Sequence, residues 1–212
     1  MVPSDPDQAA TPQPDPGAAA LERLRQAITS GDPARAMPAL AGLREIEPEQ
    51  AVPLLLLGLE QEPFLVRSLA CAGLGVKQSE AGWGALQQAL QHDNDANVRA
   101  EAANALASYG LERAWPLLRA VFAADEQWLV RCSILAAVAE HPAIPLVWLQ
   151  ELATLAIADG DGTVRVGGAE ILGRLVREAD PDLAEQARSL LLRLQGDSDH
   201  RVVAAALDGL QR

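Results

Sequence analysis

The chain has 212 residues, of which 49% are hydrophobic but only 3% aromatic, so its apolar content is mainly alanine and leucine. Both residue types favour helices over strands. A net charge of −12 at pH 7 would repel nucleic-acid phosphates and anionic membrane surfaces alike. We therefore expect an all-α protein with no nucleic-acid partner and no membrane association.

Residues 1–17 contain five prolines and three aspartates, without the basic and apolar segments of a secretory signal. This composition predicts a disordered tail at 1–17, followed by a single folded unit at 18–212. The two cysteines, Cys71 and Cys132, lie far apart and form no zinc-binding motif. They indicate a reducing compartment and a cytoplasmic protein, and we expect neither a metal site nor a bound cofactor.

A Val-Arg dipeptide recurs at nearly constant spacing through the chain. It begins at Val66, Val98, Val130 and Val164, at intervals of 32, 32 and 34 residues, and Val202 follows without the arginine. After each valine, apolar and small residues alternate with the period of a helix that has one tightly packed face. Five residues before each valine from Val98 onward stands an aspartate, which predicts a turn before the helix.

An earlier helical segment precedes each turn. In three consecutive units it carries a tryptophan, at Trp83, Trp115 and Trp148, followed by apolar residues one and two turns later. Such stripes predict helices with a buried face, and we expect these tryptophans to pack between units. Because no helical pair can bury its apolar face alone, neighbouring units must stack. The predicted units lie near 18–47, 48–79, 80–111, 112–142, 143–178 and 181–212.

The pattern of Asp93 followed by Val98-Arg99 and a helix of small residues resembles the HEAT repeat. The short period and the form of the Val-Arg segment resemble the subclass named after phycobilisome lyases. The resemblance implies a right-handed α-solenoid of about six helical hairpins, an armadillo-like superhelix. It also implies a ladder of aspartates and arginines between adjacent units, formed by Asp93, Arg99, Asp125, Arg131, Asp159 and Arg165.

We expect this ladder to be intact in units three to five. Gln61 replaces the aspartate of unit two and Val203 replaces the arginine of unit six, so we expect breaks there. Terminal repeats often depart from the pattern because one of their faces meets water. We further expect that replacing Arg131 by alanine would leave Asp125 unpaired.

The second helices of the units are expected to line the concave face of the solenoid, which is the surface that solenoids offer to partners. The third, sixth, and tenth or eleventh residues after each valine point away from the packed positions. They form a mixed, somewhat acidic set that includes the only tyrosine, and a merely solvated surface is the alternative. The predicted partner-binding residues are Leu69, Lys77, Glu101, Asn104, Tyr109, Ser133, Glu140, His141, Glu170 and Arg174.

Two further aromatic residues, Phe64 and Trp128, stand two residues before the valines of units two and four. At exposed turns they would be interface anchors. Local contacts that fix the entry of each helix explain them equally well.

No catalytic residue is predicted, because the sequence places no base and orienting acid beside a nucleophile. It also has no His-Glu pair of the kind that holds two irons in one HEAT-type enzyme class. We expect a non-catalytic scaffold or assembly chaperone that binds another protein. The resemblance implies an alternative, a bilin lyase or lyase subunit acting on phycobiliproteins, with a phycobiliprotein or its assembly factors as partner in a cyanobacterial setting. A helper in iron–sulfur cluster assembly is a third hypothesis.

Overall fold

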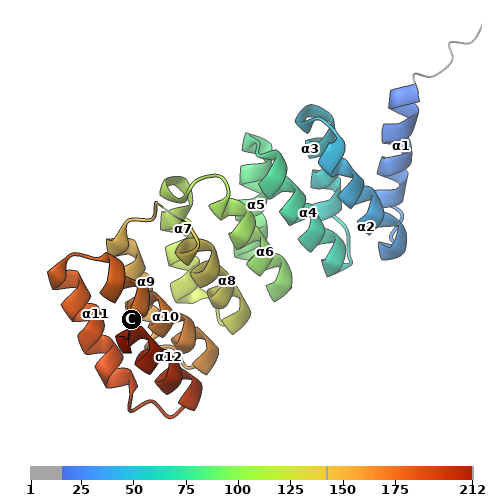
Figure 1. Ribbon diagram of the computed structural model, residues 1–212. Helices are drawn as coiled ribbons and strands as arrows, with labels where there is room; N and C mark the ends of the chain where they lie inside the picture. Colours follow the sequence, from blue (N-terminus) through green and yellow to red (C-terminus); the bar gives the residue numbers. More distant parts are fainter. Residues whose placement is uncertain (1–15, 142, 212) are drawn as a thin grey trace, which may run out of the picture.

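The computed structural model describes residues 16–141 and 143–211, and the regular structure within them is entirely helical. Each odd-numbered α-helix pairs with the next even-numbered one, and the resulting six hairpins stack from α1 to α12 (Figure 1). The prediction of an all-α solenoid is confirmed. The helices are α1 (Pro16–Ile28), α2 (Pro33–Gly42), the short 3-10 helix η1 (Leu43–Glu45), α3 (Pro48–Leu59), α4 (Phe64–Lys77), α5 (Glu80–His92), α6 (Ala96–Ala107), α7 (Leu111–Ala124), α8 (Trp128–Ala139), α9 (Leu146–Ala156), α10 (Gly162–Glu178), α11 (Pro181–Leu194) and α12 (His200–Gln211).

The predicted tail falls mostly outside the described residues, which begin at residue 16. Pro16 and Gly17 are the first residues of α1. The unit boundaries given above stay a prediction.

Aspartates at the turns begin several of the helices. The side chain of Asp95 accepts a hydrogen bond from the amide of Asn97 at 2.8 Å, and Asp161 does the same for Thr163 at 2.7 Å. Each satisfies an amide that has no partner within its helix. Between α6 and α7, Gly110 has a φ of +113°, a conformation open to glycine at little cost. Short polar segments therefore set where each hairpin turns.

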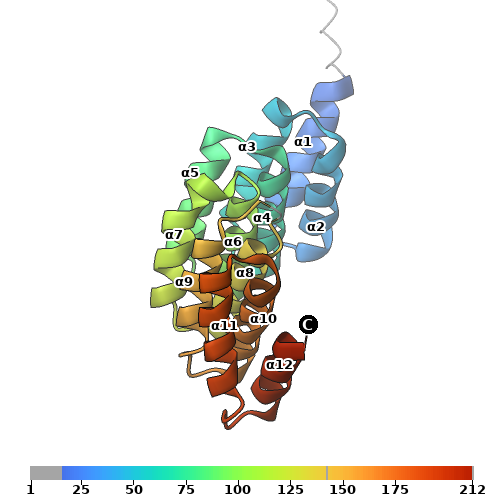
Figure 2. The same ribbon diagram turned by 60° about the vertical axis from the view of Figure 1, so that its left-hand side comes forward.

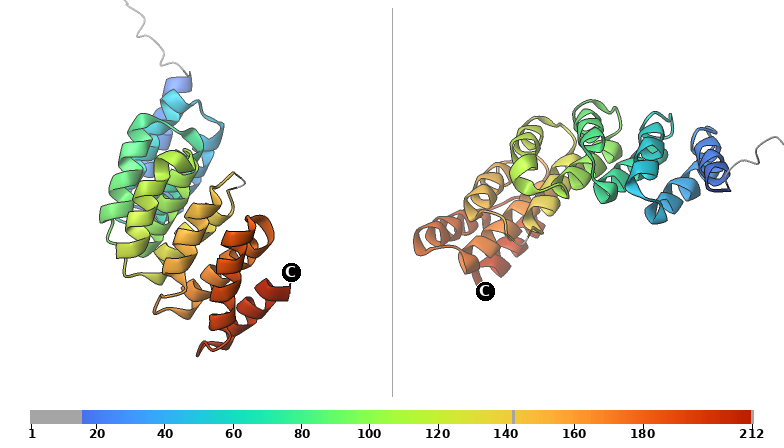
Figure 3. Two further views of the ribbon diagram at one scale, coloured as in Figure 1. Left: turned by 90° about the vertical axis from the view of Figure 1, so that its left-hand side faces the viewer. Right: turned by 90° about the horizontal axis from the view of Figure 1, so that it is seen from above.

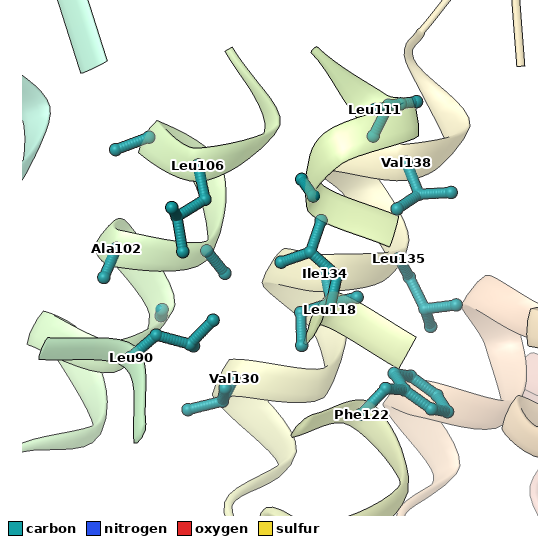
Figure 4. Packing of buried hydrophobic residues seen from close by; sticks show 14 of the residues in the cluster. Leu90, Ala102, Leu106, Leu111, Leu118, Phe122, Val130, Ile134, Leu135 and Val138 are labelled. Atoms are coloured by element: carbon teal, nitrogen blue, oxygen red, sulfur yellow. The ribbon is translucent and has the colours of Figure 1, made fainter. Parts of the chain in front are cut away.

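The core is one continuous layer of buried side chains running between the odd-numbered and even-numbered helices. Around α6, α7 and α8, Leu106 and Leu118 lie in this layer with Ile134 and Val138 (Figure 4). The valine of each Val-Arg dipeptide is buried throughout, as are Trp83 and Trp115. Trp148 is half-buried and stacks on Trp115 with ring centroids 4.9 Å apart. These tryptophans therefore contribute to packing between units, not to an open ligand site.

Neighbouring even-numbered helices approach each other much more closely than neighbouring odd-numbered helices do. The two layers are separated in Figure 2. Because one layer is packed more tightly than the other, the stack must curve toward it, and its arc is visible in the right-hand view of Figure 3. The even-numbered helices α2 to α12 therefore line the concave side.

Small residues permit this close approach. A Cβ added to Gly75 in α4 would lie 3.0 Å from the Cα of Ala105 in α6. At the equivalent place between α10 and α12, a Cβ on Gly173 would lie 2.9 Å from the Cα of Gly209. A backbone atom cannot move aside as a side chain can, so these positions require glycine.

An arginine–aspartate ladder crosses the turns between units. Arg99 Nε donates to Asp125 Oδ2 at 2.7 Å, and its Nη1 donates to the carbonyl of Asp93 at 2.9 Å. Each arginine thus binds its own turn through a backbone oxygen and the following turn through a carboxylate. The side-chain pairs are Arg67–Asp93, Arg99–Asp125, Arg131–Asp159 and Arg165–Asp197.

This pairing corrects two expectations. Unit two does not break the ladder, because its arginine, Arg67, reaches forward to Asp93, and the carbonyl of Gln61 accepts from Arg67 in place of a side chain. Arg131 pairs with the carboxylate of Asp159, while Asp125 belongs to Arg99. Loss of Arg131 would therefore leave Asp159 without its partner, not Asp125. Each arginine pairs with the aspartate of the following unit, and the sequence of a single repeat does not show this pairing.

The ladder also sets the ionisation of its aspartates. Burial alone would raise the pKa of Asp125, but hydrogen bonds from Arg99 and from the amide of Gln127 outweigh it and lower the pKa. Asp93 has a lowered pKa by the same balance of burial against Arg67 and the amide of Asp95. These carboxylates stay charged in the fold because the arginines and amides hold them so.

We expect Gly173→Ala to lower the free energy of unfolding by about 1–3 kcal/mol, because the new methyl group would meet the backbone of α12. The matched control is Gly84→Ala in α5, where nothing lies within 4 Å of the added Cβ. That change should raise stability by about 0.5–1 kcal/mol, the cost of a glycine inside a helix. Urea unfolding of both variants measures the difference, and equal effects would contradict the close approach.

We expect Arg99→Ala to lower the free energy of unfolding by about 1–3 kcal/mol, because it leaves the buried carboxylate of Asp125 without its main partner. Arg119→Ala removes an exposed ion pair with Glu151 and should cost less than about 1 kcal/mol. Chemical denaturation of the two variants checks the contrast. A loss at Arg99 no greater than at Arg119 would show that the ladder is not needed for stability.

Candidate protein-binding face

Three grooves run between neighbouring even-numbered helices on the concave side. They lie between α2 and α4, between α6 and α8, and between α8 and α10, with volumes of about 410, 500 and 460 Å³. Eight of the ten predicted partner-binding residues line one of these grooves or lie at its rim. The structure thus divides the predicted surface into separate, shallow sites.

The groove between α6 and α8 gathers four of the predicted residues: Asn104, Ser133, Glu140 and His141. The amide of Asn104 donates to the hydroxyl of Ser133 at 3.3 Å across the two helices. The Nδ1 of His141 is buried and has no hydrogen-bond partner among the described residues. Hydroxyl, amide, carboxylate and imidazole groups on one small surface can bind polar groups of a partner in several ways.

The groove between α8 and α10 is more apolar. Leu135 and Ala139 of α8 face Val166 and Ile171 of α10, and Cys132 lies at the groove as well. The predicted residues Glu170 and Arg174 line it from α10. Arg174 donates from Nη1 to the carbonyl of Ala139 at 2.6 Å and from Nε to Glu178 at 2.7 Å. Arg174 therefore ties the two helices together at one end of the groove.

The groove between α2 and α4 contains Leu69 and Lys77. The ammonium group of Lys77 donates to the carbonyls of Arg44 and Ile46 at 2.7 and 2.6 Å. It satisfies oxygens at the end of η1, so its charge is already engaged. Glu101 lies in α6, half-buried; burial raises its pKa, and a hydrogen bond from Asn104 partly offsets that rise.

Tyr109 does not line any of these grooves, contrary to the placement expected from the sequence, and its role in partner binding stays a prediction. Its ring packs on Trp83 of α5 with centroids 5.4 Å apart, and its hydroxyl donates to the carbonyl of Leu74 at 3.0 Å. The hydroxyl also accepts from the amide of Ser79. Helix α6 ends at Ala107, so helical geometry no longer places a residue eleven positions after the valine on the concave face. Tyr109 instead fills the junction between two hairpins.

Phe64 and Trp128 are the first residues of α4 and α8, not turn residues as expected. They are 37% and 46% exposed. Both therefore present part of an aromatic ring to solvent at the loop edge of the solenoid, and their role as anchors stays a prediction.

The two cysteines are in different surroundings. Cys71 is fully buried, and burial raises its pKa to about 12. Cys132 is half-buried at the groove between α8 and α10, and burial raises its pKa as well. Both thiols are free. Within residues 16–141 and 143–211, no three His, Cys, Asp or Glu side chains are placed to hold a metal ion. No helix of this part of the chain is long and apolar enough to cross a bilayer.

The apolar walls of the α8–α10 groove and the cation of Arg177 were not predicted from the sequence. One signal was present. The fifth residue after the valine is Cys71, Ala103 or Ala169 in three units but Leu135 in unit four. A large residue where its equivalents are small predicts a wider gap between helices. Recognising that gap requires knowing that this position faces the next unit.

Residues 52–139 match a family model described as HEAT repeats. Comparison with curated protein sequences finds no match. Among solved structures, Escherichia coli YibA aligns with a TM-score of 0.63 and 17% identity, covering 96% of this chain and 76% of that one. This similarity indicates a shared fold.

Two further structures align more weakly. Human deoxyhypusine hydroxylase in complex with glycerol has a TM-score of 0.48 and 15% identity, covering 90% of this chain and 96% of that one. The complex of CpcE and CpcF of phycocyanin lyase from Nostoc sp. PCC7120 has a TM-score of 0.40 and 21% identity, covering 90% and 98%. With TM-scores below 0.5, neither similarity bears on the activity of this chain.

We expect iodoacetamide to alkylate Cys132 but not Cys71 in the folded protein, because only Cys132 has solvent access. Its raised pKa keeps the thiol protonated near neutral pH, so alkylation should be slower than in the unfolded chain. The rate should climb as the pH approaches the raised pKa and the thiolate forms. Peptide mapping by mass spectrometry after timed alkylation measures both sites, and modification of Cys71 before unfolding would contradict its burial.

Proposed function

Because the chain is a solenoid of HEAT repeats, we propose that it is a non-catalytic scaffold or assembly chaperone that holds another protein on its concave face. The observation that carries this proposal is the row of grooves between the even-numbered helices. They are shallow, mostly apolar and edged by a few polar groups, which is the character of protein-binding surfaces.

The charge of the chain supports a protein as partner. With a net charge of −12, the molecule attracts neither nucleic acid nor anionic lipid through its overall field. Two of the four cations that line the grooves, Lys77 and Arg174, already donate to backbone carbonyls. The grooves therefore suit apolar and hydrogen-bonding contacts with a folded partner or a segment of one.

Ala136 offers a direct test, because it lies exposed on α8 and lines both the α6–α8 and the α8–α10 grooves. We expect Ala136→Trp to fill both grooves and to weaken partner capture by about tenfold or more, the effect of about 1.4 kcal/mol. The matched control is Ala120→Trp, an exposed alanine on α7 in the other layer. Quantitative affinity capture from a cyanobacterial lysate with tagged wild-type and variant proteins makes the comparison.

Equal capture by the Ala136→Trp and wild-type proteins would refute the concave-face proposal, provided both show the same unfolding transition. The visible absorption spectrum of the captured complex tests the alternatives in the same experiment. A bilin spectrum with phycobiliprotein subunits would favour the lyase hypothesis. A brown complex would favour iron–sulfur assembly, and a colourless complex the scaffold.

A further inference from the structure

Helices α8 and α10 pack less closely than the other neighbouring helices in the central and C-terminal part of the concave layer. Between α4 and α6, and between α10 and α12, the closest backbone approaches involve the pairs Gly75–Ala105 and Gly173–Gly209. In the repeat register the equivalent pair between α8 and α10 is Ala139 and Ile171. This pair is bulkier, and it holds the two helices apart.

Leu135 adds to the separation. It stands where the other inner units have cysteine or alanine, and a Cβ on Gly167 of α10 would lie only 3.0 Å from its Cδ1. The gap that results is the apolar groove of about 460 Å³. The gap is specific to this junction, because Leu135 and Ile171 are large residues at two positions that are small in the other inner units.

Helix α10 has 17 residues, while α8 has 12. Glu170, Arg174 and Arg177 of α10 all line the groove, at the spacing that places residues on one helix face. Arg174 is engaged with Ala139 and Glu178. Glu170 and Arg177 form no hydrogen bond or ion pair with any other side chain that the structure describes. An unpaired anion and an unpaired cation thus stand seven residues, or roughly 10 Å, apart along the groove.

We propose that the α8–α10 groove seats an amphipathic helix of the partner protein, lying antiparallel to α10, with a carboxylate against Arg177 and a cation against Glu170. The proposal rests on the concave-face function above and specifies its occupant. Helix-in-groove binding uses an apolar stripe of the kind that this groove would cover.

The direction follows from charge complementarity. Helices favour acidic residues in their first turn and basic residues in their last. A helix antiparallel to α10 runs from Arg177 towards Glu170, so an acidic residue nearer its N-terminus meets Arg177 and a basic residue seven positions later meets Glu170. The same helix in the parallel direction would bring like charges together at both ends.

The test uses two designed peptides of about 18 residues, long enough to form a helix in isolation. Both carry the same alanine and leucine stripe. The forward peptide has a glutamate seven residues before a lysine, and the reversed peptide exchanges these two residues. The readout is the alkylation rate of Cys132, which lies in the groove, in the full-length protein, with buried Cys71 as the internal control.

We expect the forward peptide at about ten times its Kd to slow alkylation of Cys132 about tenfold, since roughly nine-tenths of the grooves are then occupied. The reversed peptide meets opposite charges only when it lies parallel to α10, with its charges opposed to its own helix dipole, and should bind about tenfold more weakly. In the double variant Glu170→Gln/Arg177→Gln the forward peptide should bind about tenfold more weakly, which excludes a merely apolar effect.

Equal protection by both peptides, or protection by neither, would overturn the proposal. The concave-face function is tested separately, because it depends on Ala136 and the natural partner. If Ala136→Trp loses the partner but neither peptide protects Cys132, the scaffold proposal stands and the proposal of a helix in this groove is refuted. If Ala136→Trp binds the partner as the wild type does, both proposals are refuted.

Discussion

The close packing of neighbouring even-numbered helices is the constraint on which the rest of this structure depends. Glycine and alanine allow the backbones of α4 and α6, and of α10 and α12, to approach until no further atom fits between them. The odd-numbered helices carry leucines and tryptophans and stand farther apart. The difference between the layers bends the stack and makes the concave face, and hence the surface on which a partner can be held.

The arginine–aspartate ladder acts at the opposite end of the same helices. Each arginine joins two turns, so a rung fixes the rotation of one hairpin relative to the next. Isolated surface ion pairs contribute little to stability, but these side chains are mostly shielded and bonded to backbone as well. Close packing sets the distance between hairpins, and the ladder sets their register. A bulky residue at a position that is small in other units therefore widens one junction and leaves the neighbouring junctions unchanged.

That local independence accounts for the α8–α10 groove. In a solenoid each unit contacts only its neighbours, so one junction can change while the others stay closed. Leu135 and Ile171 open a gap that a compact domain would refill from elsewhere in its core. Glu170 and Arg177 of α10 place charges of opposite sign at different positions along this gap. The α8–α10 groove therefore differs from the other junctions of the concave face in both width and charge.

The sequence by itself determined the helices, their turns, the number of hairpins and the burial of each repeating valine, because these depend on residues a few positions apart. Eight of the ten residues that it proposed for partner binding line the grooves. Only the tertiary structure decided that Arg67 completes the ladder, that Tyr109 is a junction residue, and that α8 and α10 stand apart. Each of these depends on two side chains from different units, about 30 residues apart, and a repeat pattern read one unit at a time carries no information about which residues meet across the junction.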